Sequence, residues 1–256
     1  MGLFRSIFGQ EVENGFTLFE DTTIDGDFSM GFGVLDLNGY KLTINGNFTQ
    51  KGGDVVIGSG ELIVKGDYSI EGEAYNYRNQ PYKTYSSGRL IMNDDAGRVL
   101  VEGNFTNHSI AEKNGLLTAG LLELKGDFYQ LENYGNFKAS ENHTVLLTGE
   151  KKQVVTFAAP SVSQSHFNNL EIKNTSEEGV EFGADSACPM AIGHVKDNDI
   201  KVTGSLLVSN TTSFEDNHYS SDIYINSATL NSELEIDGNL KTGSYAYIKS
   251  NVNDEF

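Results

Sequence analysis

The chain has no tryptophan, one cysteine and three prolines, and it has half as many basic as acidic residues. Because Cys188 is the only cysteine, an internal disulfide is excluded. The balance of 18 Lys and Arg against 36 Asp and Glu disfavours nucleic acid and anionic membrane surfaces as partners, since both require clustered basic residues. No apolar run approaches the ~20 residues of a membrane-spanning helix, so no membrane span is predicted.

The acidic residues have two interpretations. A solvated acidic surface keeps a protein in solution and needs no ligand. The alternative is that some carboxylates bind Ca²⁺, although the calcium-binding nonapeptide GGxGxD is absent and KGGDVVIG does not match it. We therefore expect no cofactor, with Ca²⁺ as the alternative.

Motifs of catalysis are also missing. The five histidines form neither HxxH nor HExxH, and there is no GxSxG and no P-loop. Asp94–Asp95 and Glu177–Glu178 are adjacent pairs, and successive strand residues point to opposite faces, so they make poor acid and base partners. The sequence predicts a protein that is not an enzyme. A polysaccharide lyase or hydrolase is the enzymatic alternative, because such activities occur on parallel β-helices.

One short phrase repeats along the chain. It consists of alternating apolar residues, then Gly, then Asp or Asn, then an aromatic residue or Leu. A period near 20 residues is typical of a solenoid, in which each repeat forms one turn, here called a coil. The glycines of the phrase are Gly26, Gly46, Gly66, Gly103, Gly126 and Gly238.

The phrase and the segments between its copies read as short strands. Leu42 and Ile44 alternate with polar residues, which predicts a strand with one buried face. Second short strands are expected at 34–37, 54–58 and 89–92. We predict an all-β fold, a right-handed parallel β-helix with coils of about 20–23 residues. The rival is an antiparallel sandwich, because LDLNGYKLTI resembles a hairpin with an Asn-Gly turn.

Stacked coils place equivalent residues in files, with each coil ~4.8 Å above the last. The glycine of each phrase, which precedes the polar and aromatic residues of the same coil, is expected to allow a left-handed or tight corner. In the polar file, Asn residues between Asp residues would separate the charges and hydrogen-bond along the file. The expected aromatic file is Phe28, Phe48, Tyr68, Phe105, Phe128 and Leu240. The expected polar file is Asp27, Asn47, Asp67, Asn104, Asp127 and Asn239.

The two ends differ in pattern. Leu3, Phe4, Ile7 and Phe8 fall on one face of a helix, so residues 1–15 are predicted to form a helical cap over the first coil. A helix that docks a partner or touches a membrane is the alternative. The other end still reads as strand and shows no cap, which invites a further subunit and predicts a homo-oligomer or polymer. A covering loop or a longer native chain is the alternative there.

Residues 16–256 are predicted to form the solenoid, with loop excursions near 71–88 and 176–199. A junction between two solenoid halves is the alternative for 176–199. The first excursion is rich in tyrosine, and tyrosine rings on a polar loop bind sugars or partner proteins. The alternative is that this loop packs on the side of the coils. The candidate binding residues are Tyr75, Tyr77, Tyr82 and Tyr85.

The stretches LELKGDF, NFKASENHTVLLTGEKKQVVTF and FNNLEIKN are similar to repeats in large bacterial surface and secreted proteins with β-solenoid segments. The resemblance spans about residues 35–182 and is most specific over 136–174. It implies a passive stalk or display scaffold and carries no catalytic residue. The short coils also resemble, in style only, the bactofilins, which are intracellular filament proteins.

These observations favour a non-enzymatic structural or scaffold protein that self-associates or displays partners. A carbohydrate-binding or protein-binding module of the adhesin type is the alternative outside catalysis. MGLFRSIFGQ lacks the apolar region and cleavage site of a signal peptide. A bacterial surface or extracellular assembly and the cytoplasm therefore both stay open as locations.

Overall fold

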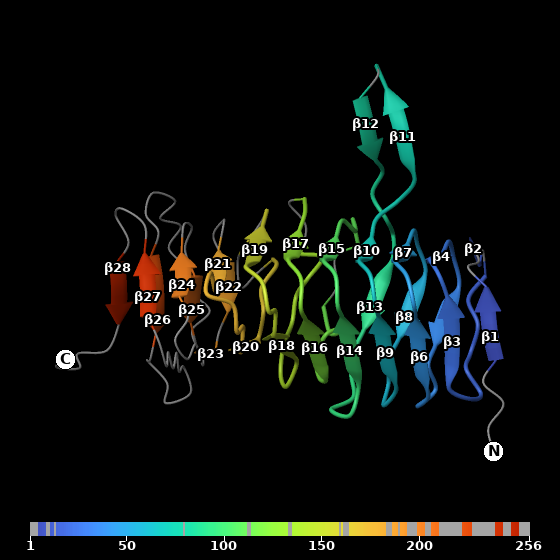
Figure 1. The fold of residues 1–256 in the computed structure, drawn as a ribbon, viewed down its shortest axis with the longest axis horizontal. Helices are drawn as coiled ribbons and strands as arrows, with labels where there is room; N and C mark the ends of the chain where they lie inside the picture. The colour runs from blue at the N-terminus through green and yellow to red at the C-terminus, as the bar shows by residue number, and fades with distance from the viewer. Residues whose placement is uncertain are drawn as a thin grey trace.

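In the computed structural model, parallel strands stack along one axis and form a β-solenoid (Figure 1). Side chains are described for residues 14–73, 78, 83–111, 114–132, 135–158, 160 and 164–181. The backbone is described for residues 5–8, 11–12, 14–78, 80–111, 114–132, 135–158, 160, 164–182, 186–188, 190–193, 199–202, 206–209, 222–226, 239–242 and 247–250.

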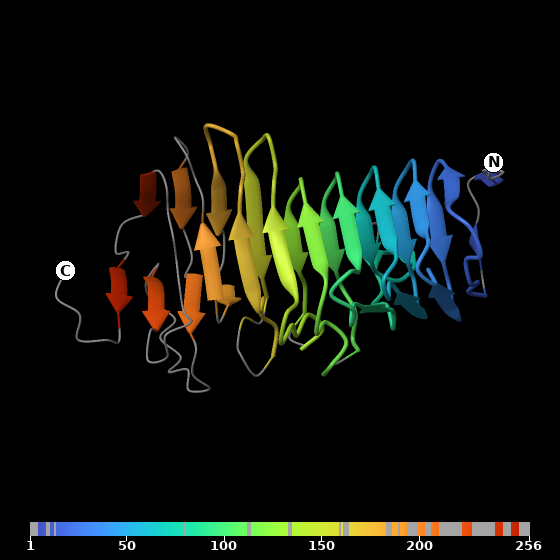
Figure 2. The same ribbon diagram turned by 90° about the horizontal axis from the view of Figure 1, so that it is seen from below.

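Two long parallel sheets form the main faces of the solenoid, and their strands lie side by side along the axis (Figure 2). The nine-stranded sheet contains, in order, β1 (Arg5–Phe8), β3 (Thr22–Asp25), β6 (Lys41–Ile44), β9 (Glu61–Val64), β14 (Arg98–Val101), β16 (Leu121–Leu124), β18 (Thr144–Leu147), β20 (Asn169–Ile172) and β23 (Met190–Gly193). The ten-stranded sheet contains β2 (Glu11–Val12), β4 (Phe28–Met30), β7 (Phe48–Gln50), β10 (Tyr68–Ile70), β15 (Phe105–Asn107), β17 (Phe128–Gln130), β19 (Gln153–Phe157), β21 (Val180–Phe182), β24 (Asp199–Val202) and β27 (Asn239–Thr242).

Shorter sheets complete the fold. A three-stranded parallel sheet closes the N-terminal coils and contains β5 (Val34–Asp36), β8 (Asp54–Val56) and β13 (Arg89–Ile91). A four-stranded sheet contains β22 (Ser186–Cys188), β25 (Leu206–Ser209), β26 (Asp222–Asn226) and β28 (Tyr247–Ser250). Among the strands that the structure describes, the exception to parallel pairing is a hairpin of β11 (Ala74–Tyr77) and β12 (Gln80–Lys83), which projects from the coils (Figure 1).

The predicted N-terminal helical cap is wrong where the backbone is described. Residues 5–8 form β1, which pairs in parallel with β3, and Ile7 lies opposite Ile24. Leu3 and Phe4 lie outside the described residues, and of Phe8 only the register, opposite Asp25, is described. Hydrogen bonding to an open sheet edge outweighs a helical spacing of four apolar residues, because short isolated helices are marginal in water. None of the described residues belongs to a helix that could cross a membrane.

The described residues of the segment 176–199, predicted as a loop excursion, include strands of the solenoid sheets. β21 and β23 continue the two long sheets, and β22 begins the four-stranded sheet. The sequence phrase disappears here, but the parallel pairing continues through β24 and β27. A solenoid needs alternating inward positions, and it does not need one particular phrase in every coil.

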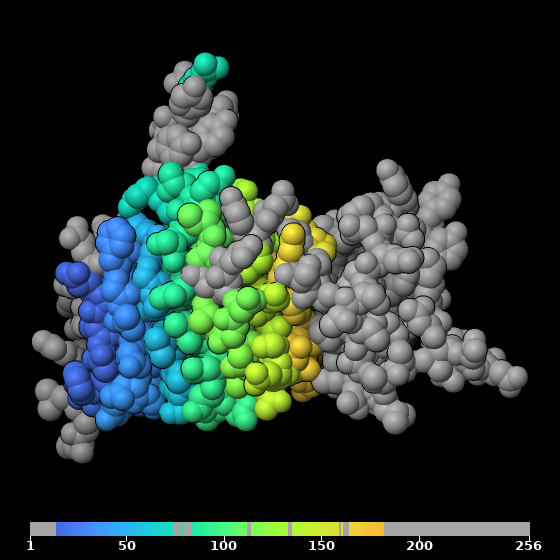
Figure 3. All heavy atoms as spheres, turned by 180° about the vertical axis from the view of Figure 1, so that it is seen from behind, coloured from blue at the N-terminus to red at the C-terminus, as the bar shows by residue number. Residues whose placement is uncertain are grey.

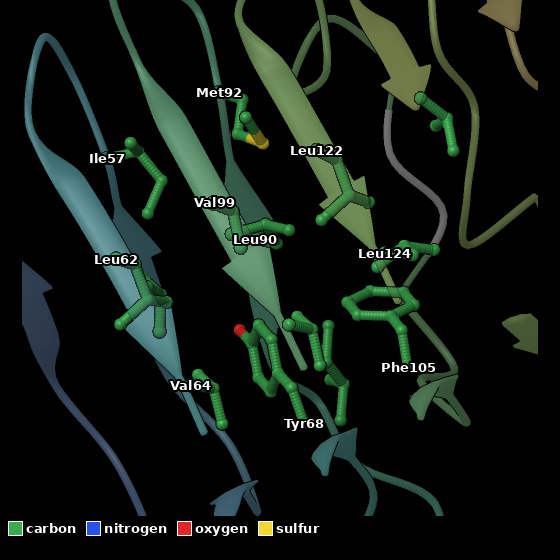
Figure 4. Close-up of a cluster of buried hydrophobic side chains, with 14 of the residues drawn as sticks. Ile57, Leu62, Val64, Tyr68, Leu90, Met92, Val99, Phe105, Leu122 and Leu124 are labelled. Atoms are coloured by element: carbon green, nitrogen blue, oxygen red, sulfur yellow. The ribbon is translucent and has the colours of Figure 1, made fainter. Parts of the chain in front are cut away.

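The core is a continuous column of inward side chains between the sheets (Figure 4). On β9, Leu62 and Val64 point inward and are fully buried, while Glu61 and Ile63 alternate with them. Tyr68 and Phe105 face these aliphatic side chains from the ten-stranded sheet (Figure 4). Full burial of one such apolar side chain contributes roughly 1.5–3 kcal/mol, so every coil adds to the stability of its neighbours.

Candidate functional site

The structure stacks the five aromatic residues of the repeated phrase on successive strands of the ten-stranded sheet. Their rings are buried, with neighbouring centroids 4.6–5.7 Å apart. Distances in this range suit stacked and edge-to-face aromatic pairs. The members of this aromatic file are Phe28, Phe48, Tyr68, Phe105 and Phe128.

Leu240 does not extend the aromatic file. The register pairs Phe128 with Val155 and Val155 with Phe182, then Val202 and Thr242. Leu240 lies two residues earlier and pairs with Ile200, so its expected place in this file is wrong. Asn239, expected in the polar file, pairs with Asp199.

The polar residues of the phrase form a second file, and their side chains bind the backbone of the next coil. In each step, a side-chain Oδ1 accepts a hydrogen bond from the backbone N–H of the equivalent residue one coil later. The five N···O distances are 2.7–2.8 Å. We call this file the Asx ladder; its acceptors are Asp27, Asn47, Asp67, Asn104 and Asp127.

This geometry explains why the ladder contains only Asp and Asn. Both side chains carry an acceptor oxygen on the second carbon of the side chain, which reaches the next backbone N–H. The backbone N–H of Val154 donates the last hydrogen bond, but the valine side chain has no acceptor, so the ladder ends there. The sequence predicted hydrogen bonds along the file but not that the donor is the backbone.

The glycine before each rung is required mainly by close contact. A Cβ at Gly66 would lie 2.3 Å from Oδ1 of Asn47, and a Cβ at Gly103 would lie 2.3 Å from Oδ1 of Asp67. Of the five glycines of this phrase up to residue 126, Gly26 alone has a positive φ, of 92°. The expected left-handed corner therefore occurs at Gly26, whereas at the later glycines the acceptor oxygen of the preceding coil takes the space of a side chain.

Charged side chains on the outer face of the nine-stranded sheet also alternate along the axis. Lys41 Nζ lies 2.6 Å from Glu61 Oε2, and Lys65 Nζ lies 2.6 Å from Glu102 Oε1. The hydrogen bond from Lys65 is the main reason that the pKa of Glu102 lies below its ordinary value. Exposed pairs of this kind are each worth about 0–1 kcal/mol, so they favour the register more than they add stability.

The hairpin brings three of the candidate tyrosines onto one two-stranded sheet. Tyr75 lies opposite Tyr82, and Tyr77 lies two residues from Tyr75 on the same strand. Directly opposite residues and residues two apart share a face, so positions 75, 77 and 82 share one face of the hairpin. The hairpin projects from the coils in the ribbon view (Figure 1), and the space-filling view shows the described coils in sequence order along the axis (Figure 3).

Tyr85 lies at the foot of the hairpin, beside residues that the sequence did not single out. Its side chain is 50% exposed, and its ring meets the ring of His108 edge to face, with centroids 5.1 Å apart. His108 Nε2 lies 3.1 Å from Glu132 Oε1. These residues are 23 and 24 positions apart, close to the coil period, and that spacing is the signal by which the sequence could have linked them.

Salt bridges hold the foot of the hairpin to the coils. Lys83 pairs with Glu71, which is buried, and Lys51 Nζ lies 2.6 Å from Glu73 Oε1. The backbone N–H of Gly72 also donates to the carbonyl of Thr84. The hairpin therefore leaves the solenoid from a fixed base.

Among the residues that the structure describes, no group of three His, Cys, Asp or Glu side chains could hold a metal ion. The side chain of His143 is fully buried, and neither ring nitrogen has a hydrogen-bond partner. Burial lowers its pKa to about 3, so the ring is neutral at ordinary pH.

Comparisons of the chain with protein-family models, with curated proteins and with solved structures found no match. The functional argument therefore depends on the geometry of the chain itself.

Proposed function

We propose that this protein is a non-enzymatic structural scaffold whose solenoids add end to end. The observation that carries the proposal is that the repeated polar side chains bind the neighbouring coil and not the solvent alone. Each Asx acceptor binds the backbone of the next coil, and the charged residues pair along the same axis. The parallel backbone pairing that these side chains accompany continues beyond the end of the ladder to β27, so a second copy can continue that pairing without a new kind of interface.

The N-terminal coils support this proposal further. β1 and β2 are the first strands of the two long sheets in the described chain, and an edge strand offers unpaired backbone groups to another strand. Of the six exposed large hydrophobic side chains among the described residues, four lie on the first coils after these strands, at Phe19, Phe32, Val34 and Tyr40. Exposed apolar side chains near an open sheet edge favour contact with another chain.

The proposal also includes the handedness of the solenoid and the location of the protein. The solenoid is taken as right-handed, because crossover connections between parallel strands are right-handed in roughly 98% of cases. The similarity of residues 136–174 to repeats of bacterial surface proteins supports a place in a surface assembly. Surface proteolysis of intact cells that produce the protein tests the location: protection of the whole pool from protease would contradict it.

A matched pair of proline variants tests assembly at β1. Alternate residues of a parallel strand direct their backbone groups to opposite neighbours, and proline removes one donor. Ser6 and Ile7 are neighbours, so their backbone N–H groups point to opposite sides of β1. Of the two variants Ser6→Pro and Ile7→Pro, one therefore removes a donor from the outer edge of β1, and the other removes a donor from the pairing with β3. We expect the outer-edge variant to stop growth of rods while its melting temperature as a monomer stays unchanged.

Light scattering and electron microscopy over a range of protein concentrations measure this difference. The variant that disrupts pairing with β3 serves as the control, because it lowers the melting temperature. The proposal fails if both variants form rods as well as the unchanged protein does, or if the unchanged protein stays monomeric.

A further inference from the structure

The foot of the hairpin exposes a small apolar patch. Tyr85 is 50% exposed and Ile110 is 45% exposed. The two residues lie on neighbouring coils, because Ser86 pairs with Ser109 and the N–H of Ile110 donates to the carbonyl of Ser86. These are the two exposed large hydrophobic side chains of the described residues that lie away from the N-terminal coils.

Polar groups lie directly beside this patch. The His108 ring contacts the ring of Tyr85 and is hydrogen-bonded to the carboxylate of Glu132. Three successive coils thus contribute an aromatic ring, an imidazole and a carboxylate to one line on the surface. The carboxylate accepts hydrogen bonds from hydroxyl groups, and the ring offers an apolar surface.

The backbone holds Glu132 in an unusual conformation. Its φ is 70°, in a left-handed region that costs a non-glycine residue of the order of 1–3 kcal/mol and is often found in ligand-binding segments. The carbonyl of Glu132 accepts a hydrogen bond of 2.9 Å from Nε2 of the buried Gln130. The carboxylate therefore projects from a fixed support beside His108.

We propose that Tyr85, His108 and Glu132 form a binding site for a neutral, β-linked glycan. In such sugars the ring hydroxyl groups are equatorial, so the axial C–H groups make a flat apolar face that stacks on an aromatic ring, while the hydroxyl groups donate to a carboxylate. This site is separate from the edge of β1, so glycan binding and assembly are measured independently.

Charge and size select this class of ligand. The net charge of −18 and the Glu132 carboxylate disfavour acidic polysaccharides. A stable protein partner needs roughly 800 Å² on each side, whereas the described patch contains two exposed apolar side chains. Ring stacking with a few directed hydrogen bonds suits a short stretch of sugar chain better.

Isothermal titration calorimetry with cellohexaose and chitohexaose tests the site, with maltohexaose as the α-linked probe and hexagalacturonate as the acidic probe. We expect at least one β-linked neutral probe to bind with a Kd of about 1 mM or lower. Tyr85→Ala is expected to weaken that binding by about tenfold or more, while Tyr85→Phe keeps the ring and retains it. Glu132→Gln keeps the contact with His108 but loses the charge, and it is expected to weaken binding about threefold or more.

Glu150→Gln is the matched control for Glu132→Gln, because Glu150 is also a glutamate accessible to solvent but lies on another coil. Its glycan binding is expected to equal that of the unchanged protein. Absence of binding to both β-linked probes would overturn the proposal, as would equal binding by Tyr85→Ala with an unchanged melting temperature. If maltohexaose or hexagalacturonate bound as tightly as the β-linked neutral probes or more tightly, the proposed class of ligand would be wrong. If the protein bound no glycan but captured a protein through Tyr85, the ligand would be a protein partner.

Discussion

Replacement of His143 by leucine is expected to make the protein more resistant to acid. The His143 side chain is fully buried, its ring nitrogens have no hydrogen-bond partner, and its ring meets Phe137 edge to face at 6.0 Å between centroids. A charged imidazole has no compensation in such a place, and burial lowers its pKa from 6.5 to about 3. His143→Leu removes the titrating group and keeps an apolar side chain in the core.

The sign of the effect follows from proton linkage. Between pH 6.5 and pH 3 the unfolded chain binds a proton at His143 and the folded chain does not, so stability falls as the pH falls through this window. Each pH unit is worth about 1.4 kcal/mol, which gives a loss of about 3 kcal/mol between pH 8 and pH 4. Above pH 6.5 the ring is neutral in both states, and this contribution is constant.

Urea unfolding of both proteins at several pH values between about pH 8 and pH 4 measures the difference. The many carboxylates titrate in both proteins, so the difference between the two free energies of unfolding isolates His143. We expect that difference to grow in favour of His143→Leu by about 3 kcal/mol at the acid end. A difference that stays constant with pH would refute the argument and would mean that the ring is hydrated or paired in solution.

Two further substitutions test the files of the repeat. Tyr68→Phe removes the hydrogen bond of 2.7 Å from the buried Tyr68 hydroxyl to Gln50 Oε1, and urea unfolding should show a loss of about 1–2 kcal/mol; no loss would mean that the bond adds nothing to stability. Asn47→Asp keeps the acceptor for the N–H of Asp67. It also places a third carboxylate between those of Asp27 and Asp67, at a coil spacing of ~4.8 Å, and repulsion should lower the free energy of unfolding by about 1 kcal/mol per neighbour at low salt. High salt should restore the melting temperature of Asn47→Asp but not that of Asn47→Ala, which loses the acceptor, and equal salt responses would contradict the role of charge spacing.

The coil architecture could be predicted from sequence because one phrase combines several local requirements. Phe48 must point inward, Asn47 must reach the next coil, and Gly46 must leave room for Oδ1 of Asp27. Each requirement restricts the residue type at its position, so together they produce a repeat that can be recognised in the sequence. Where the Asx ladder ends at Val154, the phrase also fades, although the parallel pairing continues.

The N-terminal strand could not be predicted in the same way. Leu3, Phe4, Ile7 and Phe8 fit a helical spacing, and the local pattern contains no information about the open edge of β3. Pairing with that edge is a tertiary interaction, and it outweighs local spacing in a short segment.

The sequence did not predict the candidate site or the burial of His143, because segments of irregular length interrupt the repeat before these residues. The hairpin between β10 and β13 separates Tyr85 from the phrase before it, yet the chain returns in register, so Tyr85 meets His108 on the next coil. A polar residue in a turn is usually exposed, whereas His143 is fully buried and its ring contacts that of Phe137. Only the packing of neighbouring coils determines such burial.

The central claim is that the contacts between coils continue from one molecule to the next. Electron cryo-microscopy of the purified protein at increasing concentration tests it most directly. The account predicts rods that lengthen with concentration and show one strand spacing of ~4.8 Å running unbroken through the junctions between subunits. Particles that keep the length of a single solenoid at every concentration would contradict it.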